Sequence, residues 1–360
     1  MSLHIRSIIF GGQKVNNAIK LTQLFLTARF ARARSRFAVP VLIYKDKNLC
    51  RGATLSVGVE QFGRRGWDFF STGGVGVEED GATNLPDKSR LGRQEELCDK
   101  VRGQDIKLLK ELRVRLICDL MYQQKKLKFM LPVASSEKVD KAGRYREFLL
   151  ASLPYPGCES FRGYQSKYLN SDKLRFNWKV EKVDAILKIP DGVVHKPLGV
   201  NWAEYKEWSI KDMTSCYTRL LLYQLENSNG GVFVHCISGW DRTPMFISLL
   251  RLSLWADGLA HASLNPLEML FFTVAYDWRL FGHKLSDRNS KSEEIFYFGM
   301  DYLEHMTDSE FSIHCGLQKS DKCPELVKIR RDKLLEVRRL FIGSYNQYII
   351  PKNMKFSHIS

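Results

Sequence analysis

The sequence predicts an α/β layered fold in which a central mixed sheet is flanked by helices. Apolar runs of strand length, bounded by turn residues, recur through the first two thirds of the chain. Helical spacing dominates the last third, which contains one strongly apolar strand at 231–235. This mixture of the two element types favours layered packing of helices on a sheet.

Each element is predicted from its local pattern. Apolar residues spaced three and four apart predict helices at 15–30, 106–112, 242–257 and 325–345. Continuous apolar runs predict strands at 37–44, 55–59, 116–121, 129–133, 148–153 and 231–235. Pro244 suits the first turn of the helix that follows the last strand, and Gly258 suits the position after its last turn. Residues 72–94 are rich in Gly, Ser and Asp and predict a surface loop.

The composition is that of a globular protein with an unusual charge. Of the 360 residues, 44% are hydrophobic and 26% are charged, which argues against a disordered or fibrous chain. The net charge of +15 suits a polyanionic partner, namely nucleic acid, an anionic membrane or a phosphorylated substrate. Nucleic acid is poorly supported, because no zinc-finger spacing and no RNP-type aromatic motif accompanies the charge.

The cysteine pattern indicates the compartment. The eight cysteines include no Cys-x-x-Cys pair, which argues against zinc-ribbon and thioredoxin-type sites. The chain is also longer than disulfide-rich secreted domains, so we expect a reduced, intracellular protein. No apolar run approaches the roughly 18 residues that span a bilayer. Any membrane contact is therefore expected to be peripheral.

Positive charge is concentrated near the amino terminus. Residues 1–60 carry ten basic and two acidic side chains, and the predicted helix 15–30 ends in the arginine cluster of 29–36. We expect either a solvated basic face on a helix packed against the domain or a surface that binds an anionic membrane; a transit peptide is a third alternative. The basic helix 325–345 allows the first two interpretations as well.

The most informative feature is the segment 235–243, which reads His-Cys-Ile-Ser-Gly-Trp-Asp-Arg-Thr. It places Cys236 at the end of a strand and Arg242 at the start of a helix. The backbone N–H groups between them can surround a tetrahedral anion, helped by the positive end of the helix. The same field favours the thiolate form of Cys236, and Arg242 offers a planar fork to phosphoryl oxygens. The pattern indicates a phosphate-transfer site, with a buried structural cysteine as the plainer alternative.

The same segment resembles the phosphate-binding loop of the myotubularin phosphoinositide phosphatases, whose hallmark is Cys-x-x-Gly-Trp-Asp-Arg. Further segments that resemble one branch of that family lie at 100–106, 135–141, 154–159, 248–257 and 275–278. The resemblance covers residues 36–315 and implies a cysteine-dependent, tyrosine-phosphatase-like fold. We therefore expect a basic helical segment at 1–36, a phosphatase catalytic domain at 37–315, and a linker with a basic amphipathic helix at 316–360.

The resemblance also implies the activity. The family removes the 3-phosphate from phosphatidylinositol 3-phosphate and phosphatidylinositol 3,5-bisphosphate through a phosphocysteine, without a metal or other cofactor. The expected partners are the phosphoinositide substrate and an anionic membrane surface. The implied location is the cytoplasm, with peripheral association with endosomal or autophagic membranes. Two other functions stay open, a protein tyrosine or dual-specificity phosphatase and an inactive lipid-binding scaffold.

Roles for residues of the loop follow from the resemblance. Cys236 is expected to attack phosphorus, and Thr243 to hydrogen-bond its thiolate. Trp240 is expected to rest against the inositol ring or to pack the loop. The groups expected to hold the phosphoryl oxygens are the Arg242 side chain and the loop amides, at Ile237, Ser238, Gly239 and Trp240. His235 is expected either to order the loop or to be an ordinary core histidine.

The sequence leaves alternatives for the general acid and for the residues that contact the other phosphates of the substrate. We favour Asp241 inside the loop as the acid, with Asp191 in the turn Ile189-Pro190-Asp191 as the alternative. His283, Lys284 and Arg288 belong to a segment that resembles a family motif, and they are candidates for contacting a second phosphate or the diester phosphate; a solvated basic helix end is the alternative. Ser238 stands where most active members carry Asp, which leaves the preference between mono- and bisphosphate open.

Overall fold

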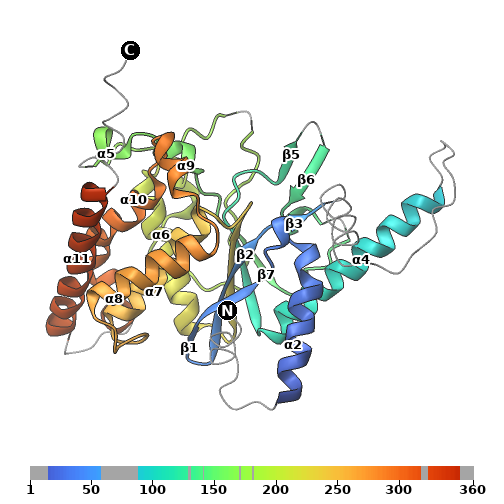
Figure 1. Cartoon of the computed structure of the whole chain (residues 1–360), viewed down its shortest axis with the longest axis horizontal. Helices are drawn as coiled ribbons and strands as arrows, with labels where there is room; N and C mark the ends of the chain where they lie inside the picture. The colour runs from blue at the N-terminus through green and yellow to red at the C-terminus, as the bar shows by residue number, and fades with distance from the viewer. Residues whose placement is uncertain are drawn as a thin grey trace.

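A mixed five-stranded sheet lies at the centre of the molecule (Figure 1). Its strands, in spatial order, are β1 (Val39–Tyr44), β2 (Lys47–Ala53), β8 (Gly231–Cys236), β4 (Val114–Asp119) and β7 (Leu149–Ser152). β1 is antiparallel to β2, whereas β2, β8, β4 and β7 run parallel, so their carboxyl ends meet at one end of the sheet. The computed structural model describes residues 15–57, 88–128, 131–140, 142–169, 172–180, 182–317 and 323–348.

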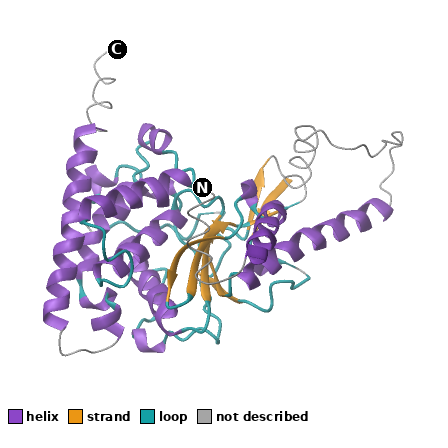
Figure 2. Cartoon of the chain, turned by 60° about the horizontal axis from the view of Figure 1, so that its bottom comes forward, coloured by secondary structure: helices purple, strands orange, loops and turns teal. Residues whose placement is uncertain are grey.

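Helices cover both faces of this sheet (Figures 1 and 2). On one face lie α2 (Val15–Ala28) and α4 (Lys88–Glu111), which share a core with Phe233 of β8. The thicker layer covers the other face and shares a core with Val232 and Val234. Its main helices are α6 (Ile210–Asn227), α7 (Arg242–Ala256), α10 (Ile295–Asp301) and α11 (Cys323–Tyr348). Because side chains alternate along a strand, β8 is buried on both sides.

Several shorter elements join these layers. They include α5 (Tyr164–Lys167), α8 (Pro266–Phe272), the π-helix η7 (Thr273–Leu280), α9 (Leu285–Ser290) and the 3-10 turns η1 (Arg29–Ala31) and η2 (Ala33–Ser35). A second, antiparallel sheet consists of β3 (Leu55–Ser56), β6 (Leu131–Ser135) and β5 (Lys125–Lys128). It adjoins the carboxyl end of the central strands, since the N–H of Thr54 donates to the carbonyl of Cys236 at 2.9 Å.

The predicted α/β arrangement of a mixed sheet between helices is confirmed. The predicted elements around 39–44, 114–119, 149–152 and 242–256 are present, as are the first and last predicted helices. The predicted loop 72–94 is wrong over 88–94, where α4 has already begun; its first part, 72–87, lies outside the described residues. The first two residues of the strand predicted at 129–133 and the last two of that predicted at 55–59 also lie outside them.

Two arginines of the basic segment 29–36 make contacts inside the protein. The Arg32 side chain is fully buried, where it donates to Asp105 at 3.0 Å and also pairs with Glu137. Arg36 donates to the carbonyl of Ser238 at 3.3 Å. The predictions of a solvated or membrane-binding face are therefore wrong for these two arginines, because internal acceptors already bind them.

The basic carboxy-terminal helix packs on the domain, as the first of its two interpretations expects. Arg330 of α11 is buried and pairs with Asp257 at 2.7 Å, and Arg338 pairs with Asp301 at 2.6 Å. In the part of the chain that the structure describes, no helix combines the length and the apolar character that crossing a bilayer requires.

Candidate active site

The segment 236–242 forms a tight loop at the carboxyl end of the central sheet. β8 ends at Cys236 and α7 begins at Arg242, as the sequence predicts. Gly239 adopts a φ of +68°, and a Cβ atom there would lie 2.6 Å from the carbonyl oxygen of Gly52. A glycine is therefore required for both the backbone conformation and the close approach to β2.

Three side chains from outside this loop contact its backbone carbonyl oxygens through their nitrogen atoms. The pairs are Arg36 with Ser238 at 3.3 Å, Arg51 with Gly239 at 3.0 Å, and His283 Nδ1 with Trp240 at 3.1 Å. The C=O and N–H of one peptide unit point in opposite directions, so these contacts turn the following amides inward. The N–H of Gly239 accordingly lies 3.3 Å from Cys236 Sγ. The loop thus presents donors to whatever binds above the sulfur.

Cys236 lies at the base of this ring of donors and is 3% exposed. Burial alone would raise the pKa of its thiol, but the charge of Arg242 and the hydrogen bonds of Thr243 outweigh burial and lower the pKa. A larger fraction of the sulfur is therefore thiolate, which is the nucleophilic form.

Replacing Thr243 with valine tests this electrostatic account. Loss of the hydroxyl is expected to raise the pKa of Cys236, so alkylation by iodoacetamide below that pKa should slow about tenfold. The measurement is the alkylation rate against pH, with Thr243→Ser as the control that keeps the hydroxyl. An unchanged profile in Thr243→Val would show that the hydroxyl does not stabilise the thiolate.

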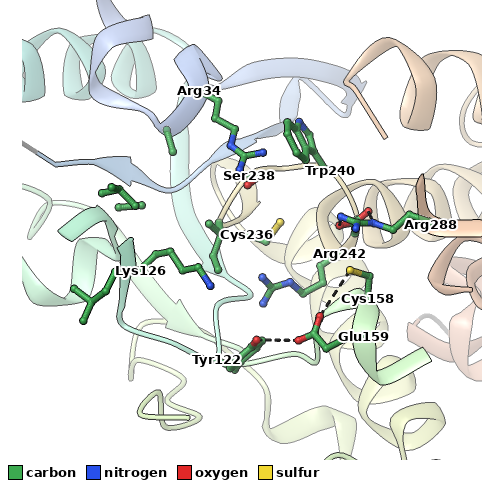
Figure 3. A pocket seen from close by; sticks show the side chains of 17 residues that line it. Arg34, Tyr122, Lys126, Cys158, Glu159, Cys236, Ser238, Trp240, Arg242 and Arg288 are labelled. Carbon is green, nitrogen blue, oxygen red and sulfur yellow. Dashed lines mark hydrogen bonds and ion pairs between the residues drawn. The ribbon is translucent and has the colours of Figure 1, made fainter. Parts of the chain in front are cut away.

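Arg242 is fixed with one edge toward the protein. Its Nη1 donates to the carbonyls of Leu120 at 2.8 Å and Tyr155 at 3.1 Å, and its guanidinium lies 5.3 Å from the Tyr122 ring. The two hydrogens on Nη1 are thereby used, and the rest of the fork faces the pocket (Figure 3). That orientation leaves donors for a bound oxyanion.

The loop opens into a pocket of about 320 Å³. Residues outside the loop that line it and carry polar side chains are Arg34, Tyr122, Lys126, Cys158, Glu159 and Arg288 (Figure 3). On its floor are Cys236 and Arg242. Basic groups therefore outnumber the acidic groups Glu159 and Asp241 around a space that suits an anionic headgroup.

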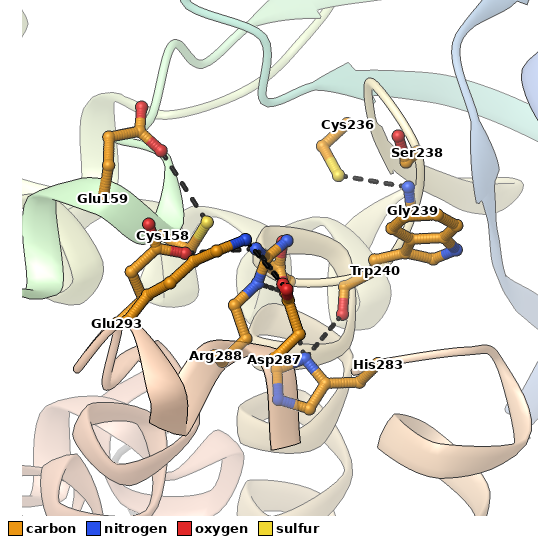
Figure 4. Close-up of polar contacts among 12 residues, drawn as sticks. Cys158, Glu159, Cys236, Ser238, Gly239, Trp240, His283, Asp287, Arg288 and Glu293 are labelled. Atoms are coloured by element: carbon orange, nitrogen blue, oxygen red, sulfur yellow. Dashed lines mark hydrogen bonds and ion pairs between the residues drawn. The ribbon is translucent and has the colours of Figure 1, made fainter. Parts of the chain in front are cut away.

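Asp241 is held as a carboxylate by two side chains. Arg288 Nη2 donates to Oδ2 at 2.8 Å, and His283 Nδ1 lies 3.0 Å from Oδ1. Figure 4 shows Arg288 and His283 on the side of the loop that carries Trp240. Burial opposes ionisation, but these hydrogen bonds from His283 and Arg288 outweigh it and lower the pKa of Asp241 to about 2. In the absence of substrate Asp241 is therefore ionised at neutral pH.

Of the predicted site residues, most lie around the pocket. Ile237, Ser238, Trp240, Asp241, Arg242 and Arg288 line it with Cys236, and Gly239 contributes its N–H. Lys284 is exposed beside the loop, with its Nζ 5.2 Å from the Trp240 ring.

Two predicted placements need correction. His283 is 7% exposed, packed against Trp278 and bonded to Asp241, so it reaches substrate only through Asp241. Thr243 is fully buried, and its hydrogen bonds act on Cys236. Asp191 lies in an exposed turn next to Gly192, which approaches Leu149 at the start of β7, the opposite end of the sheet. Asp191 is therefore too remote to protonate a group bound above Cys236.

A buried ion-pair network lies directly behind the loop. His235 Nε2 is 3.0 Å from Glu137, and Lys138 Nζ is 3.0 Å from Asp119. Although Asp119, Glu137 and His235 bring ligand atoms within 4.8 Å of one another, Lys138 and Arg32 already neutralise the two carboxylates. These residues thus fit an internal ion-pair network better than a metal centre. His235 is a core histidine, and burial, which lowers its pKa, is outweighed by Glu137, which raises it.

Comparison with known proteins finds relatives whose names describe them as phosphoinositide phosphatases. No protein-family model matches it. It is 51% identical over 304 residues to human phosphatidylinositol-3,5-bisphosphate 3-phosphatase MTMR14, covering 81% of this chain and 45% of that protein. The mouse protein of the same name is 48% identical, covering 84% of this chain and 47% of its own length. A yeast phosphoinositide 3-phosphatase is 26% identical over 106 residues, or 29% of this chain and 14% of the yeast protein. The chain spans about half the length of the two mammalian relatives.

Proposed function

We infer that this chain, which belongs to the myotubularin family in the branch of MTMR14, is a cysteine-dependent phosphoinositide 3-phosphatase. The observation that carries the proposal is a thiol of lowered pKa at the base of a loop whose amides and Arg242 converge above it. The names of the mammalian relatives suggest phosphatidylinositol 3,5-bisphosphate as a substrate, and we propose phosphatidylinositol 3-phosphate as well. The central sheet with its phosphate loop supports a tyrosine-phosphatase-like catalytic domain over 37–315.

In the first step the Cys236 thiolate attacks phosphorus. An S–P bond forms, the bond between phosphorus and O3 of inositol breaks, and the electron pair leaves on O3. Arg242 and the loop amides stabilise the charge on the three other phosphoryl oxygens. Asp241 supplies the proton that O3 needs, since it is the carboxyl group at the edge of the loop.

In the second step a water molecule attacks the phosphocysteine. Asp241, now a carboxylate, accepts a proton from the water as its oxygen bonds to phosphorus. The S–P bond breaks, which regenerates the Cys236 thiolate and releases inorganic phosphate. Arg288 and His283 position Asp241 in both steps through their hydrogen bonds.

The acid role requires Asp241 to gain a proton that it lacks in the resting enzyme. A phosphate monoester bound beside it adds negative charge, which raises the pKa of a neighbouring carboxyl group. Protonated Asp241 is the form needed in the first step, so this step slows as pH rises through the pKa of Asp241 in the complex.

Asp241→Asn is therefore expected to lower kcat on a phosphoinositide by about 10²- to 10⁴-fold. The loss should be much smaller on p-nitrophenyl phosphate, whose leaving group does not need protonation. Phosphate or nitrophenol release measures both rates, and Asp287→Asn, which removes an exposed partner of Arg288, is the control. Equal losses on the two substrates would assign Asp241 to positioning only.

Reaching a lipid headgroup requires the pocket mouth to face a membrane. The hairpin strand β5 borders the pocket, and there Lys125 and Leu127 are both exposed, Leu127 by 57%. A cation beside an apolar side chain suits peripheral contact with an anionic bilayer. We propose such contact from the cytoplasm, at endosomal or autophagic membranes.

A panel of substrates tests the proposed function. We expect kcat/KM for the two 3-phosphorylated lipids to exceed that for phosphatidylinositol 4-phosphate and for phosphotyrosine peptides. Malachite-green detection of phosphate measures all of them under one set of conditions. A preference for phosphotyrosine peptides would show that the protein is a protein tyrosine phosphatase instead. Absence of turnover on every substrate would favour the alternative of an inactive lipid-binding scaffold.

A further inference from the structure

Three cations outside the phosphate loop line the pocket. Arg288 is bound to Asp241, and the other two approach from different sides. Arg34 comes from the segment 29–36 and Lys126 from β5. Figure 3 shows both side chains directed into the space above Cys236, Arg34 from the side of Trp240 and Lys126 from the side of Tyr122. The pocket therefore offers two separate positions for anionic groups besides the one at the loop.

Arg34 is placed by a strained and well-anchored backbone. Its φ of 58° and that of Ser35, 55°, both lie in the left-handed region, which is costly for residues other than glycine. Flanking hydrogen bonds hold the segment, with Ala33 N–H donating to Thr54 at 2.8 Å and Arg36 accepting from Ala53 at 3.0 Å. Local strain of this kind persists where the surrounding structure over-determines it, and it concentrates at ligand sites.

The Arg34 side chain is oriented as well. Its guanidinium carbon lies 3.7 Å from the centroid of the Trp240 ring, so the two planes are in contact. Stacking on an aromatic face fixes the plane of the fork while its N–H groups remain directed along the edges. Arg34 is thus prepared for two-point binding of a phosphate, with little conformational entropy left to lose.

The inositol headgroup carries phosphate groups at two positions that could reach these two cations. In the inositol ring C1 and C5 are each two bonds from C3, on opposite sides. With the 3-phosphate above Cys236, the C1 and C5 substituents reach different walls of the pocket. We propose that Arg34 binds the 5-phosphate of a bisphosphorylated headgroup and so determines the preference for it; this proposal rests on the proposed function.

Two features assign the 5-phosphate to Arg34 and the diester to Lys126. A 5-phosphate is a monoester with three terminal oxygens, which suits the two-point fork of arginine, whereas a diester has two and suits the point charge of lysine. The diester also continues into the acyl chains. It therefore belongs on the wall that carries the exposed Leu127.

The test compares two soluble, short-chain lipids, phosphatidylinositol 3-phosphate and phosphatidylinositol 3,5-bisphosphate. In Arg34→Gln the ratio of kcat/KM for the bisphosphate to that for the monophosphate is expected to fall about 10- to 100-fold, with partial recovery in Arg34→Lys. Lys126→Gln should lower both values by a similar factor and leave the ratio in place. Arg115→Gln, an exposed arginine at the other end of the sheet, is the matched control.

A binding measurement separates this proposal from the proposed function. Calorimetry with Cys236→Ser and with Cys236→Ser/Arg34→Gln measures Kd for inositol 1,3,5-trisphosphate and inositol 1,3-bisphosphate without turnover. A selective loss of affinity for the trisphosphate supports the subsite even if the wild-type chain hydrolyses neither lipid. An unchanged ratio in both assays, or equal losses for the two ligands, would overturn it.

Discussion

Cys236→Ser is expected to lower kcat on phosphatidylinositol 3-phosphate by at least about 10⁴-fold. Arg242 and Thr243 lower the pKa of the Cys236 thiol, but a serine hydroxyl starts from a far higher pKa and stays protonated in the same field. Release of phosphate, followed to a single turnover, measures the residual rate. The hydrogen-bond donors of the loop and Arg242 are retained in Cys236→Ser, so this variant should bind the headgroup while failing to cleave it.

The matched control is Cys98→Ser, which makes the same chemical change on α4, outside the pocket. Its kcat should stay within about threefold of the wild-type value, because surface changes away from a site have small effects. Residual activity above one tenth in Cys236→Ser would contradict nucleophilic catalysis by this residue.

The second large effect concerns stability. Arg32→Met is expected to lower the free energy of unfolding by about 3–5 kcal/mol, since removing one partner of a buried ion pair leaves the other charge uncompensated. Here two carboxylates would be left, Asp105 and Glu137, in a site where the Arg32 side chain is fully buried. Burial opposes the Arg32 charge, but these carboxylates raise its pKa.

Urea denaturation followed by circular dichroism measures the change. Lys20→Met is the control, because the Lys20 side chain is 65% exposed and its ion pair with Glu111 spans 3.8 Å. Its effect should be within about 0.5 kcal/mol. If Arg32→Met were no more destabilising than Lys20→Met, the buried network would not support the segment that carries Arg34.

Much of the fold was predictable because apolar runs dominate its central strands. β8 is buried along its whole length and is apolar up to His235, and β4 contains the buried apolar run from Leu116 to Cys118. β2 was not predictable in this way, since Asn48 and Arg51 interrupt its sequence. Arg51 is buried through tertiary contacts with the loop carbonyl of Gly239 and the Phe281 ring, and local sequence carries no signal for such contacts.

The residues of the candidate site also fall into those that a local sequence pattern predicts and those that only tertiary contacts bring together. Cys236 and Arg242 were predictable from one contiguous motif, whose spacing between strand and helix already requires an anion-binding turn. Arg34, Arg36 and Lys126 come from segments distant in sequence and meet the loop only in the folded chain. A charge cluster such as 29–36 indicates a polyanion but does not distinguish a membrane surface from a pocket wall.

The position of the phosphate removed tests the central claim most directly. Wild-type protein is incubated with phosphatidylinositol 3,5-bisphosphate, and the lipid product is identified by chromatography against both monophosphate standards. A phosphate loop that orients the 3-phosphate over Cys236 predicts phosphatidylinositol 5-phosphate as the product, absent with Cys236→Ser. Phosphatidylinositol 3-phosphate as the product, or the same turnover with Cys236→Ser, would contradict the account.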